Sequence, residues 1–362
     1  MMTARELAPV FARAPEALRD KRGALGFDGF RDVLTRPVRD AETKTHFSTI
    51  AEFGEYLASK AGKSGSITLD VVSERVGGNM PLVSKALGAF GLAADLYGML
   101  GAPGPAPLFA SMPECLRLHG FCAPGEATAL EFDDGKLFFM PERPLAQPPW
   151  ALLRAAHPDV AERFGAADFA ALLNWSELDF SQALWESVYE DCFAHAQADF
   201  SRFVFFDLCD CTPRGDGEIR RVLELIGRFG EKRRAVLSLN ENEALVCARA
   251  ALPGVQADPG EIAARLGERF GIAEVVVHTY RESICAHGGG LARVPTRFVA
   301  RPMISTGGGD NFNAGYILAS LLGLDAQARL LTANMTSNYY IRHGQSAAPA
   351  ELAAFAETYD AD

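Results

Sequence analysis

Three consecutive glycines, Gly307, Gly308 and Gly309, lead into Asp310 and a helical stretch that we expect to continue to about Leu322. Glycine lets the backbone approach a ligand closely, and the free N–H groups of a helix N-terminus favour an anion. An aspartate at that place can accept a proton from a hydroxyl that attacks phosphorus, so the segment suits phosphoryl transfer. Taken alone, it fits equally well a tight loop in which Asp310 only caps the helix.

Two other nucleotide-binding motifs fit the chain less well. A dinucleotide fingerprint, G-x-G-x-x-G, needs a glycine where the sequence has Phe312. A Walker A loop would end at Gly62-Lys63-Ser64, but Leu57 replaces its first glycine, and the segment follows a predicted helix rather than a strand. These mismatches argue against a dinucleotide-dependent oxidoreductase and against a P-loop enzyme.

Polar residues also stand just past the ends of several predicted strands. They are Asp28, Asp207, Asn240 and Thr279. Parallel strands bring their carboxyl ends to one edge of a sheet, and ligands bind beyond that edge. The shared position indicates a ligand site, although we interpret Asp207 and Asp210 as strand-end caps, with magnesium binding as the alternative.

The elements that must position these residues alternate between strand and helix. Strands that are apolar throughout, separated by amphipathic helices, are typical of a parallel sheet covered on both faces. We expect strands at 23–27, 92–99, 172–175, 203–206, 235–239 and 274–278. We expect helices at 45–60, 77–90, 168–171, 180–198, 217–229, 258–270 and 307–322. The pattern predicts an α/β fold of three layers.

A second, smaller sheet is indicated by a β-branched segment at 66–72 and by short apolar runs between 115 and 140. Within the latter, Asp134-Gly135 has the residue types of a two-residue hairpin turn. We expect one domain over residues 1–362, with lid strands at approximately 40–76 and 115–140 inserted in the α/β core. An uncovered edge of the lid sheet would favour a homodimer.

The composition narrows the partners. The net charge of −11 and the lack of a basic run argue against nucleic acid. No apolar run is long enough for a membrane span, and the charged first 22 residues do not resemble a secretory signal, so we expect a cytoplasmic protein. The seven scattered cysteines indicate reduced thiols, and no second pair completes a zinc site with Cys209 and Cys211.

The segment from Thr306 to Gly315 resembles the C-terminal signature of the ribokinase-like (PfkB) carbohydrate kinases, D-T-T-G-A-G-D-x-F-x-A-G. The signature departs from this sequence at Ile304, Ser305 and Gly308, which stand for Asp, Thr and Ala. The missing Asp bears on the monovalent-cation site that some members of the family have.

Other motifs of that family follow in order. Asp28 resembles the aspartate that binds substrate hydroxyls, and Gly77-Gly78-Asn79 resembles the G-G-N signature of the sugar pocket, whose second Asn is Leu82 here. The N-x-x-E motif, which helps to hold magnesium, is similar to Asn240-Glu241-Asn242-Glu243. The helix that flanks adenine resembles 331–343, with Asn334 and Asn338, while Thr279 and Thr306 would also contact the nucleotide.

The resemblance spans roughly residues 23–345 and implies a ribokinase-like fold with a β-sheet lid. It implies an ATP-dependent kinase that phosphorylates a sugar or sugar-like hydroxyl with Mg²⁺ and, in some members, a monovalent cation. Asp310 would be the base, and Gly307, Gly308 and Gly309 the anion hole. Two alternatives stay open: a nucleoside kinase, and a catalytically silent nucleotide- or sugar-binding regulatory protein on the same fold.

Overall fold

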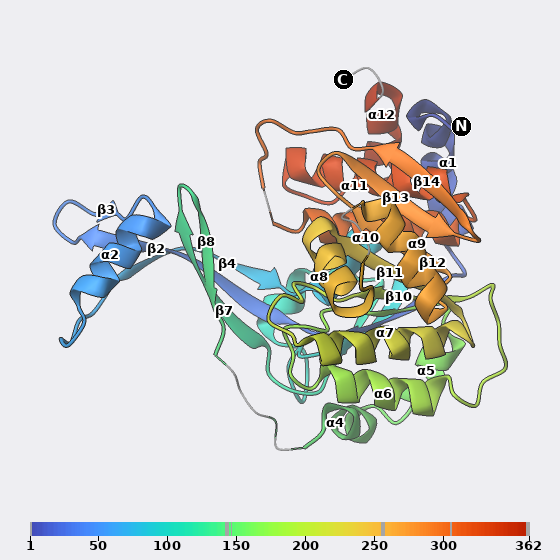
Figure 1. Ribbon diagram of the computed structural model, residues 1–362, viewed down its shortest axis with the longest axis horizontal. Coiled ribbons are helices and arrows are strands. Elements are labelled where there is room, and N and C mark those ends of the chain that lie inside the picture. Colours follow the sequence, from blue (N-terminus) through green and yellow to red (C-terminus); the bar gives the residue numbers. More distant parts are fainter. Residues whose placement is uncertain (1, 142–144, 146, 255–257, 305, 360–362) are drawn as a thin grey trace.

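The computed structural model describes residues 2–141, 145, 147–254, 258–304 and 306–359, in which a large α/β body carries a projecting small sheet (Figure 1). The body is built on a nine-stranded sheet that is parallel except at β13, which runs antiparallel to its two neighbours, β12 and β14. Its strands, in spatial order, are β14 (Gly290–Pro295), β13 (Glu282–His287), β12 (Glu274–His278), β11 (Arg234–Asn240), β10 (Phe203–Asp207), β9 (Phe169–Leu172), β1 (Arg22–Phe27), β5 (Ala93–Gly98) and β6 (Leu116–Gly120).

Helices cover both faces of this sheet. One face packs against α4 (Pro149–Ala156), α5 (Val160–Ala166), α6 (Ser181–Cys192), α7 (Asp216–Gly230), α8 (Glu241–Ala251) and α9 (Pro259–Phe270). The other packs against α1 (Ala4–Ala17), α3 (Asn79–Ala89), α10 (Gly308–Leu321), α11 (Ala326–His343) and α12 (Pro349–Tyr359). Side chains alternate between the two cores along a strand, as Val204 and Phe206 against Phe203 and Phe205 illustrate. The three-layer α/β/α fold is confirmed.

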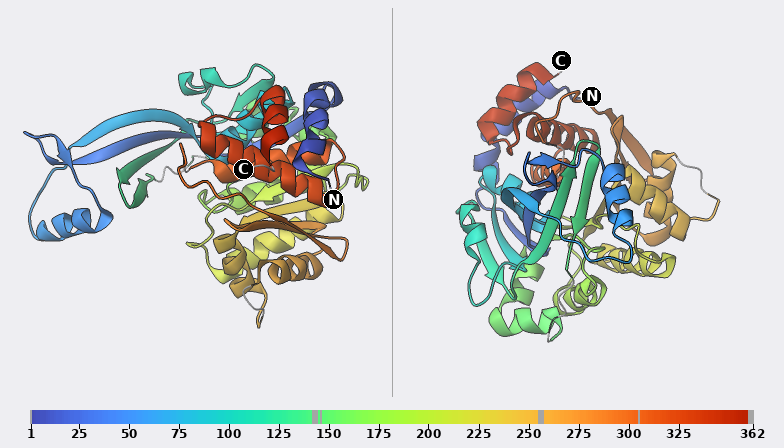
Figure 2. Two further views of the ribbon diagram at one scale, coloured as in Figure 1. Left: turned by 90° about the horizontal axis from the view of Figure 1, so that it is seen from above. Right: turned by 90° about the vertical axis from the view of Figure 1, so that its left-hand side faces the viewer.

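The small sheet forms a lid that projects from the body (Figures 1 and 2). It contains β2 (Phe30–Asp40), β3 (Thr45–His46), β4 (Leu69–Gly77), β7 (Gly125–Phe132) and β8 (Gly135–Phe139), with α2 (Ile50–Ser59) packed on its far end. β2 pairs antiparallel with β4 and parallel with β7. The predicted hairpin joins β7 to β8, but its two turn residues are Asp133 and Asp134 rather than Asp134 and Gly135, because Gly135 already pairs with Phe132. A 3₁₀ helix, η1 (Pro107–Ser111), lies between β5 and β6.

Several predicted elements differ from the structure. Residues 169–172 form strand β9, not a helix, because this short apolar run is buried between β1 and β10. The lid includes β2, for which no strand was expected, while β6 belongs to the main sheet although it lies within the predicted lid segment 115–140. The strand predicted at 66–72 is displaced to 69–77. The helix predicted from residue 45 begins at Ile50, where the Thr49 side chain caps it.

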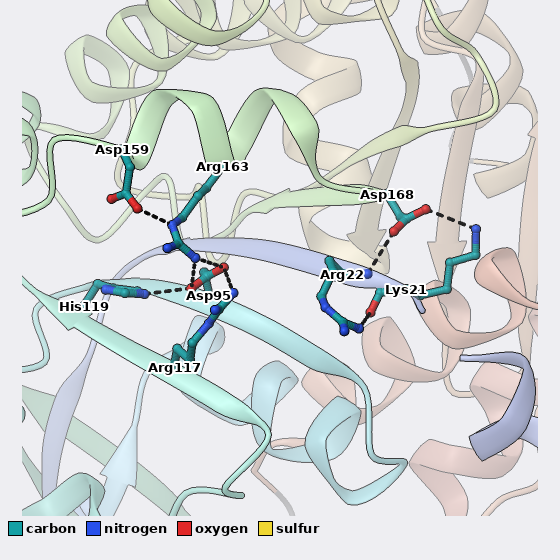
Figure 3. A network of polar contacts seen from close by, with 8 residues as sticks. All are labelled: Lys21, Arg22, Asp95, Arg117, His119, Asp159, Arg163 and Asp168. Atoms are coloured by element: carbon teal, nitrogen blue, oxygen red, sulfur yellow. Dashed lines mark hydrogen bonds and ion pairs between the residues drawn. The ribbon is translucent and has the colours of Figure 1, made fainter. Parts of the chain in front are cut away.

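A network of charges ties the β5–β6 edge of the main sheet to α5 (Figure 3). Asp95 on β5 is 5% exposed and accepts hydrogen bonds from Arg117 (2.7 Å), His119 (2.8 Å) and Arg163 (3.3 Å). Although burial opposes it, these partners hold the pKa of Asp95 below its usual value. The cluster is therefore a compensated ion network at the border of the sheet.

The thiols of all seven cysteines are free, as expected. Within the described part of the chain, no helix combines the length and the apolar character needed to cross a bilayer.

Candidate active site

Asp28, the residue that follows β1, is held at the N-terminus of α3. It is fully buried, and its carboxylate accepts hydrogen bonds from the backbone N–H groups of Asn79 (2.6 Å) and Met80 (2.8 Å). These are unpaired donors of the first helical turn, so a carboxylate from a distant strand caps the helix. Burial nevertheless raises the pKa of Asp28 to about 7.

Asn79 connects this helix end to a second one. Its side-chain amide donates to Oδ1 of Asp310 (3.1 Å), which lies in the first turn of α10. An asparagine at this place could simply cap the helix, but the cap position of α3 belongs to Gly78, so the geometry favours a role for Asn79 in the site. Two motifs about 230 residues apart in the sequence thus meet at one point.

The Asp310 carboxyl is buried and surrounded by other acids. Burial raises the pKa of Asp310 well above its usual value, and the nearby Asp207 and Asp28 raise it further. A raised pKa makes a carboxylate a stronger proton acceptor, which is the property that a general base requires.

The glycines at the N-termini of α3 and α10 leave no room for side chains. Gly307 caps α10 with φ 87°, and a Cβ there would lie 2.8 Å from the Tyr340 hydroxyl oxygen. Gly78 has φ 97°, and a Cβ there would lie 2.7 Å from Oδ2 of Asp28. A Cβ on Gly77 would collide with the Asp32 carboxylate. Gly308 and Gly309 begin the helix, so their N–H groups are among its free donors.

The structure adds three polar residues that the sequence reading missed. Asn174 follows β9 with φ 57°, is fully buried, and donates from one side-chain nitrogen to Asp28 and to Glu177, both at 2.9 Å. Its side-chain oxygen is buried without a hydrogen-bond partner among the described residues. Asp32 of β2 completes the group, and burial followed by the charge of Glu177 raises its pKa to about 6. The spacing Asn174-x-x-Glu177 after a strand repeats that of Asn240-x-x-Glu243 and was the available signal.

Asn240 and Glu243 form a capping box at the start of α8. The Glu243 carboxylate accepts from the Asn240 backbone (2.8 Å) and side chain (2.6 Å), and it is 6% exposed. Burial raises the pKa of Glu243 well above its usual value, with the charge of Asp207 as the next cause.

The buried carboxylates of Glu243 and Asp207 could hold a magnesium ion through water. The described residues contain no group of three or more His, Cys, Asp or Glu side chains with the geometry of a direct metal site. Mg²⁺ keeps several waters and binds through one or two carboxylates together with substrate phosphates, so Glu243 and Asp207 suffice. Asp207 also accepts from the backbone of Cys209 (2.7 Å) and from Asn313 (2.5 Å), which agrees with its predicted capping position.

A cavity of about 290 Å³ adjoins the glycine turn on the side of α11. Gly308 and Gly309 form one wall, while Thr279, Asn334 and Asn338 line other parts of it, as the adenine-site prediction requires. The Asn338 amide donates to the carbonyl of Arg297 (2.8 Å), but its side-chain oxygen is buried without a partner in the described structure. An amino group on a planar base could donate to that oxygen.

Thr306 does not line this cavity. It lines a second one of about 790 Å³, which extends under the lid and also contacts Ile304 and Leu82. Its predicted nucleotide contact is therefore not supported by its position. Ser305 lies outside the described residues, and the apolar side chain of Ile304 offers no ligand to a monovalent cation.

The arrangement combines what a phosphoryl transfer needs. Free helix N–H groups can hold a phosphate, a buried carboxylate lies at the same helix end, and a pair of acids can hold Mg²⁺. On the far side of Asn79, the carboxylates of Asp28, Asp32 and Glu177 can accept hydrogen bonds from a polyhydroxylated substrate, and the amide of Asn174 can exchange hydrogen bonds with it.

Sequence comparison places the chain in a known family. Residues 1–359 match the sequence family described as prokaryotic ketohexokinase. The ketohexokinase of Haloferax volcanii is 27% identical over 357 residues, which cover 95% of this chain and 93% of that protein.

Solved structures share the fold. Adenosine kinase from Sinorhizobium meliloti (TM-score 0.64, 16% identity) matches 94% of this chain and 99% of its own. Ribokinase from Thermotoga maritima (0.62, 12%) matches 92% and 98%. Phosphofructokinase-2 from Escherichia coli (0.62, 12%) matches 94% and 100%. The resemblance to the ribokinase-like kinases is confirmed, and the chain belongs to the prokaryotic ketohexokinase family of PfkB carbohydrate kinases, which use ATP to phosphorylate an alcohol group.

Proposed function

We propose that this protein is a ketohexokinase in which Asp310 removes the proton from a primary hydroxyl of a ketohexose as that oxygen attacks the γ-phosphorus of ATP. The observation that carries the proposal is the hydrogen bond from Asn79 to Asp310, because Asn79 also donates its backbone N–H to Asp28. A sugar bound at Asp28 would therefore present a hydroxyl next to the buried base.

The N-termini of α3 and α10 have different tasks in the proposed transfer: the first binds the sugar, and the second holds the phosphoryl group and the base. The bond between Pγ and the β,γ-bridging oxygen of ATP breaks as the bond from Pγ to the sugar oxygen forms, ADP leaves, and the hydroxyl proton passes to Asp310. The N–H groups of Gly307, Gly308 and Gly309 stabilise charge on the moving phosphoryl group. Mg²⁺, held through water by Glu243, Asn240 and Asp207, would neutralise phosphate charge when bound. Closure of the lid would exclude water that otherwise competes as the acceptor.

The acceptor pocket suits a sugar because it is rich in oxygen acceptors. Burial, and after it the charge of Glu177, raises the pKa values of Asp28 and Asp32, and hydroxyl donors would stabilise their ionised forms. Gly77, Gly78 and Asn79 would form the floor of the pocket. The family match favours a ketohexose over a nucleoside.

An ADP-release assay over a panel of acceptors tests the proposal. Fructose and other ketohexoses should be the best substrates, with aldohexoses, ribose and nucleosides far slower. A clear preference for a nucleoside, or no turnover with any acceptor, would contradict it.

We also propose a homodimer through the lid, because its outer strands expose apolar side chains. Val71 and Val72 on β4 are 60% and 52% exposed, and Phe138 and Phe139 near the other edge are 49% and 54% exposed. Light scattering of the intact protein, compared with a Val71→Lys/Val72→Lys variant, measures this. A monomer at assay concentrations would refute the dimer. A cytoplasmic location stays a prediction.

A further inference from the structure

The charges around the proposed transfer site are predominantly negative. Burial raises the pKa values of Asp28, Asp207 and Asp310, and the charge of Glu177 raises each of them further; Asp207 and Asp28 also raise the pKa of Asp310. ATP brings further negative charge into this region. Mg²⁺ would offset that charge on the side of Glu243, but the glycine turn supplies only neutral N–H groups on the side of the lid.

One cation on the lid faces this turn. Arg75 of β4 lies directly opposite Asp32 of β2 in the antiparallel register, so the two side chains share one face of the sheet. Asp32 on that face lies against Gly77 at the root of the lid, where β4 enters the body (Figure 1). Arg75 therefore emerges on the lid face that borders the acceptor site.

The 790 Å³ cavity links Arg75 to the glycine turn. Arg75, Asp32, Thr306 and Tyr340 all line it. The Tyr340 hydroxyl lies next to Gly307, and burial raises its pKa; the charge of Asp310 raises this pKa further, and that of Arg75 lowers it. The guanidinium and the catalytic carboxylate are thus both within electrostatic reach of the same hydroxyl.

Arg75 has no anionic partner in the described part of the chain. The adjacent Glu74 is bound by Arg31 through two hydrogen bonds (2.6 and 3.1 Å) on the opposite face of the strand pair. Asp32 forms no ion pair with Arg75, and the pKa of Asp32 is raised rather than lowered. An unpaired arginine beside a phosphate-binding turn is suited to a bidentate contact with phosphate oxygens.

We propose that Arg75 contacts the phosphoryl group during its transfer, from the lid side, opposite the N–H groups of Gly307–Gly309. The proposal rests on the proposed kinase reaction and adds a cation to it; Arg75 forms no covalent bond and exchanges no proton. Because the residue belongs to the lid, the contact would form as the lid closes, and it would link closure to phosphoryl transfer.

Arg75→Gln tests this contact. Removing one hydrogen-bond donor that stabilises the charge of a transition state typically lowers kcat by about 10²–10³-fold. We expect a loss of that size in kcat, with little change in KM for the sugar and an unchanged Tm. Arg75→Lys should retain part of the rate, since it keeps the charge without the bidentate geometry.

Two matched controls isolate the position. Arg31→Gln removes a neighbouring lid arginine that is paired with Glu74, and Lys85→Gln removes another cation from the wall of the same cavity. Both should keep kcat within about twofold, because surface charges far from the reacting group contribute little. An equal loss of kcat in all three variants would overturn the proposal.

Guanidinium rescue separates a phosphate contact from a structural role. Guanidinium ion should raise the rate of Arg75→Ala, whereas urea, its neutral analogue, should not. Wild-type kcat in Arg75→Gln, or no rescue of a folded Arg75→Ala, would refute the contact. Slow ATP hydrolysis without sugar provides the same comparison with water as the acceptor. If no ketohexose is a substrate, the proposed function fails, but the Arg75 contact can still be judged from hydrolysis.

Discussion

Two buried aspartates of this protein, Asp95 and Asp310, have pKa values shifted in opposite directions. Asp95, at the edge of the main sheet, is surrounded by Arg117, Arg163 and His119, and its pKa is lowered (Figure 3). Asp310, at the carboxyl edge of the same sheet, has an amide donor and other acids around it, and its pKa is raised. Burial favours a raised pKa for both carboxyls; the partners of Asp95 outweigh it, whereas the acids near Asp310 add to it.

The difference separates a structural role from a chemical one. A compensated carboxylate stabilises the fold and has little tendency to accept a proton. An uncompensated one costs stability and is kept where proton transfer or ligand binding needs it. The comparison therefore predicts that substitutions at the two places will change different properties.

The largest expected effect is the loss of activity in Asp310→Asn. An amide cannot accept the hydroxyl proton, so kcat should fall by about 10²–10⁴-fold. ATP should still bind, because Asn79 and the glycine turn remain, and a nucleotide-induced thermal shift measures this binding. Near-normal turnover would exclude Asp310 as the base. Asp95→Asn, as the matched control, should keep its kcat.

Asp95→Asn should instead lose stability. Arg117 and Arg163 would keep their charges without their shared carboxylate, and we expect a loss of about 2 kcal/mol in the free energy of unfolding. The value is below the about 3–5 kcal/mol typical of a fully buried pair, because the Arg117 side chain is 56% exposed. Urea unfolding measures it, with Asp159→Asn as the exposed control on Arg163. Equal losses in the two variants would show that burial of Asp95 is irrelevant.

Gly78→Ala should disturb Asp28 through packing. The new Cβ would lie 2.7 Å from the carboxylate in a backbone conformation with φ 97°, which costs about 1–2 kcal/mol by itself. Gly91→Ala, at φ 76° with no atom within 4 Å, carries the backbone penalty alone. We expect only Gly78→Ala to lower kcat/KM for the sugar. The same kinetic change in both variants would contradict the assigned role of Asp28.

The smallest effect concerns the pH dependence of stability at Asp32. The pKa of Asp32 is raised from 3.8 to about 6, so the fold favours its protonated carboxyl. The resulting contribution to the free energy of unfolding is fully present below pH 3.8 and is lost as the pH rises through 6. At pH 8, Asp32→Asn should therefore be more stable than the wild type by about 1–2 kcal/mol, and the gain should vanish near pH 4. For Asp95, with a lowered pKa, stability is present above pH 3.8 and is lost as the pH falls. A pH-independent effect of Asp32→Asn would show that its carboxylate is not destabilised in the fold.

The sequence by itself determined the main architecture and much of the site. Long apolar strands between amphipathic helices predict a covered parallel sheet because their periodicity is local and repeated. The glycines before Asp310, and the Asn240–Glu243 capping box, are also local patterns, and the structure has them at helix starts. Motif order then identified the family, which the match over residues 1–359 confirms.

Only the tertiary structure decided which distant residues share a site. Apart from the Asn174-x-x-Glu177 spacing, Asn174, Glu177 and Asp32 look in the sequence like many exposed polar residues. They converge because β9 ends, and β2 begins, beside Asp28. Strand β9 was mistaken for a helix because four apolar residues have no period that separates the two forms. Pairing partners, burial and raised pKa values depend on contacts between segments far apart in the chain, and local sequence does not encode these contacts one segment at a time.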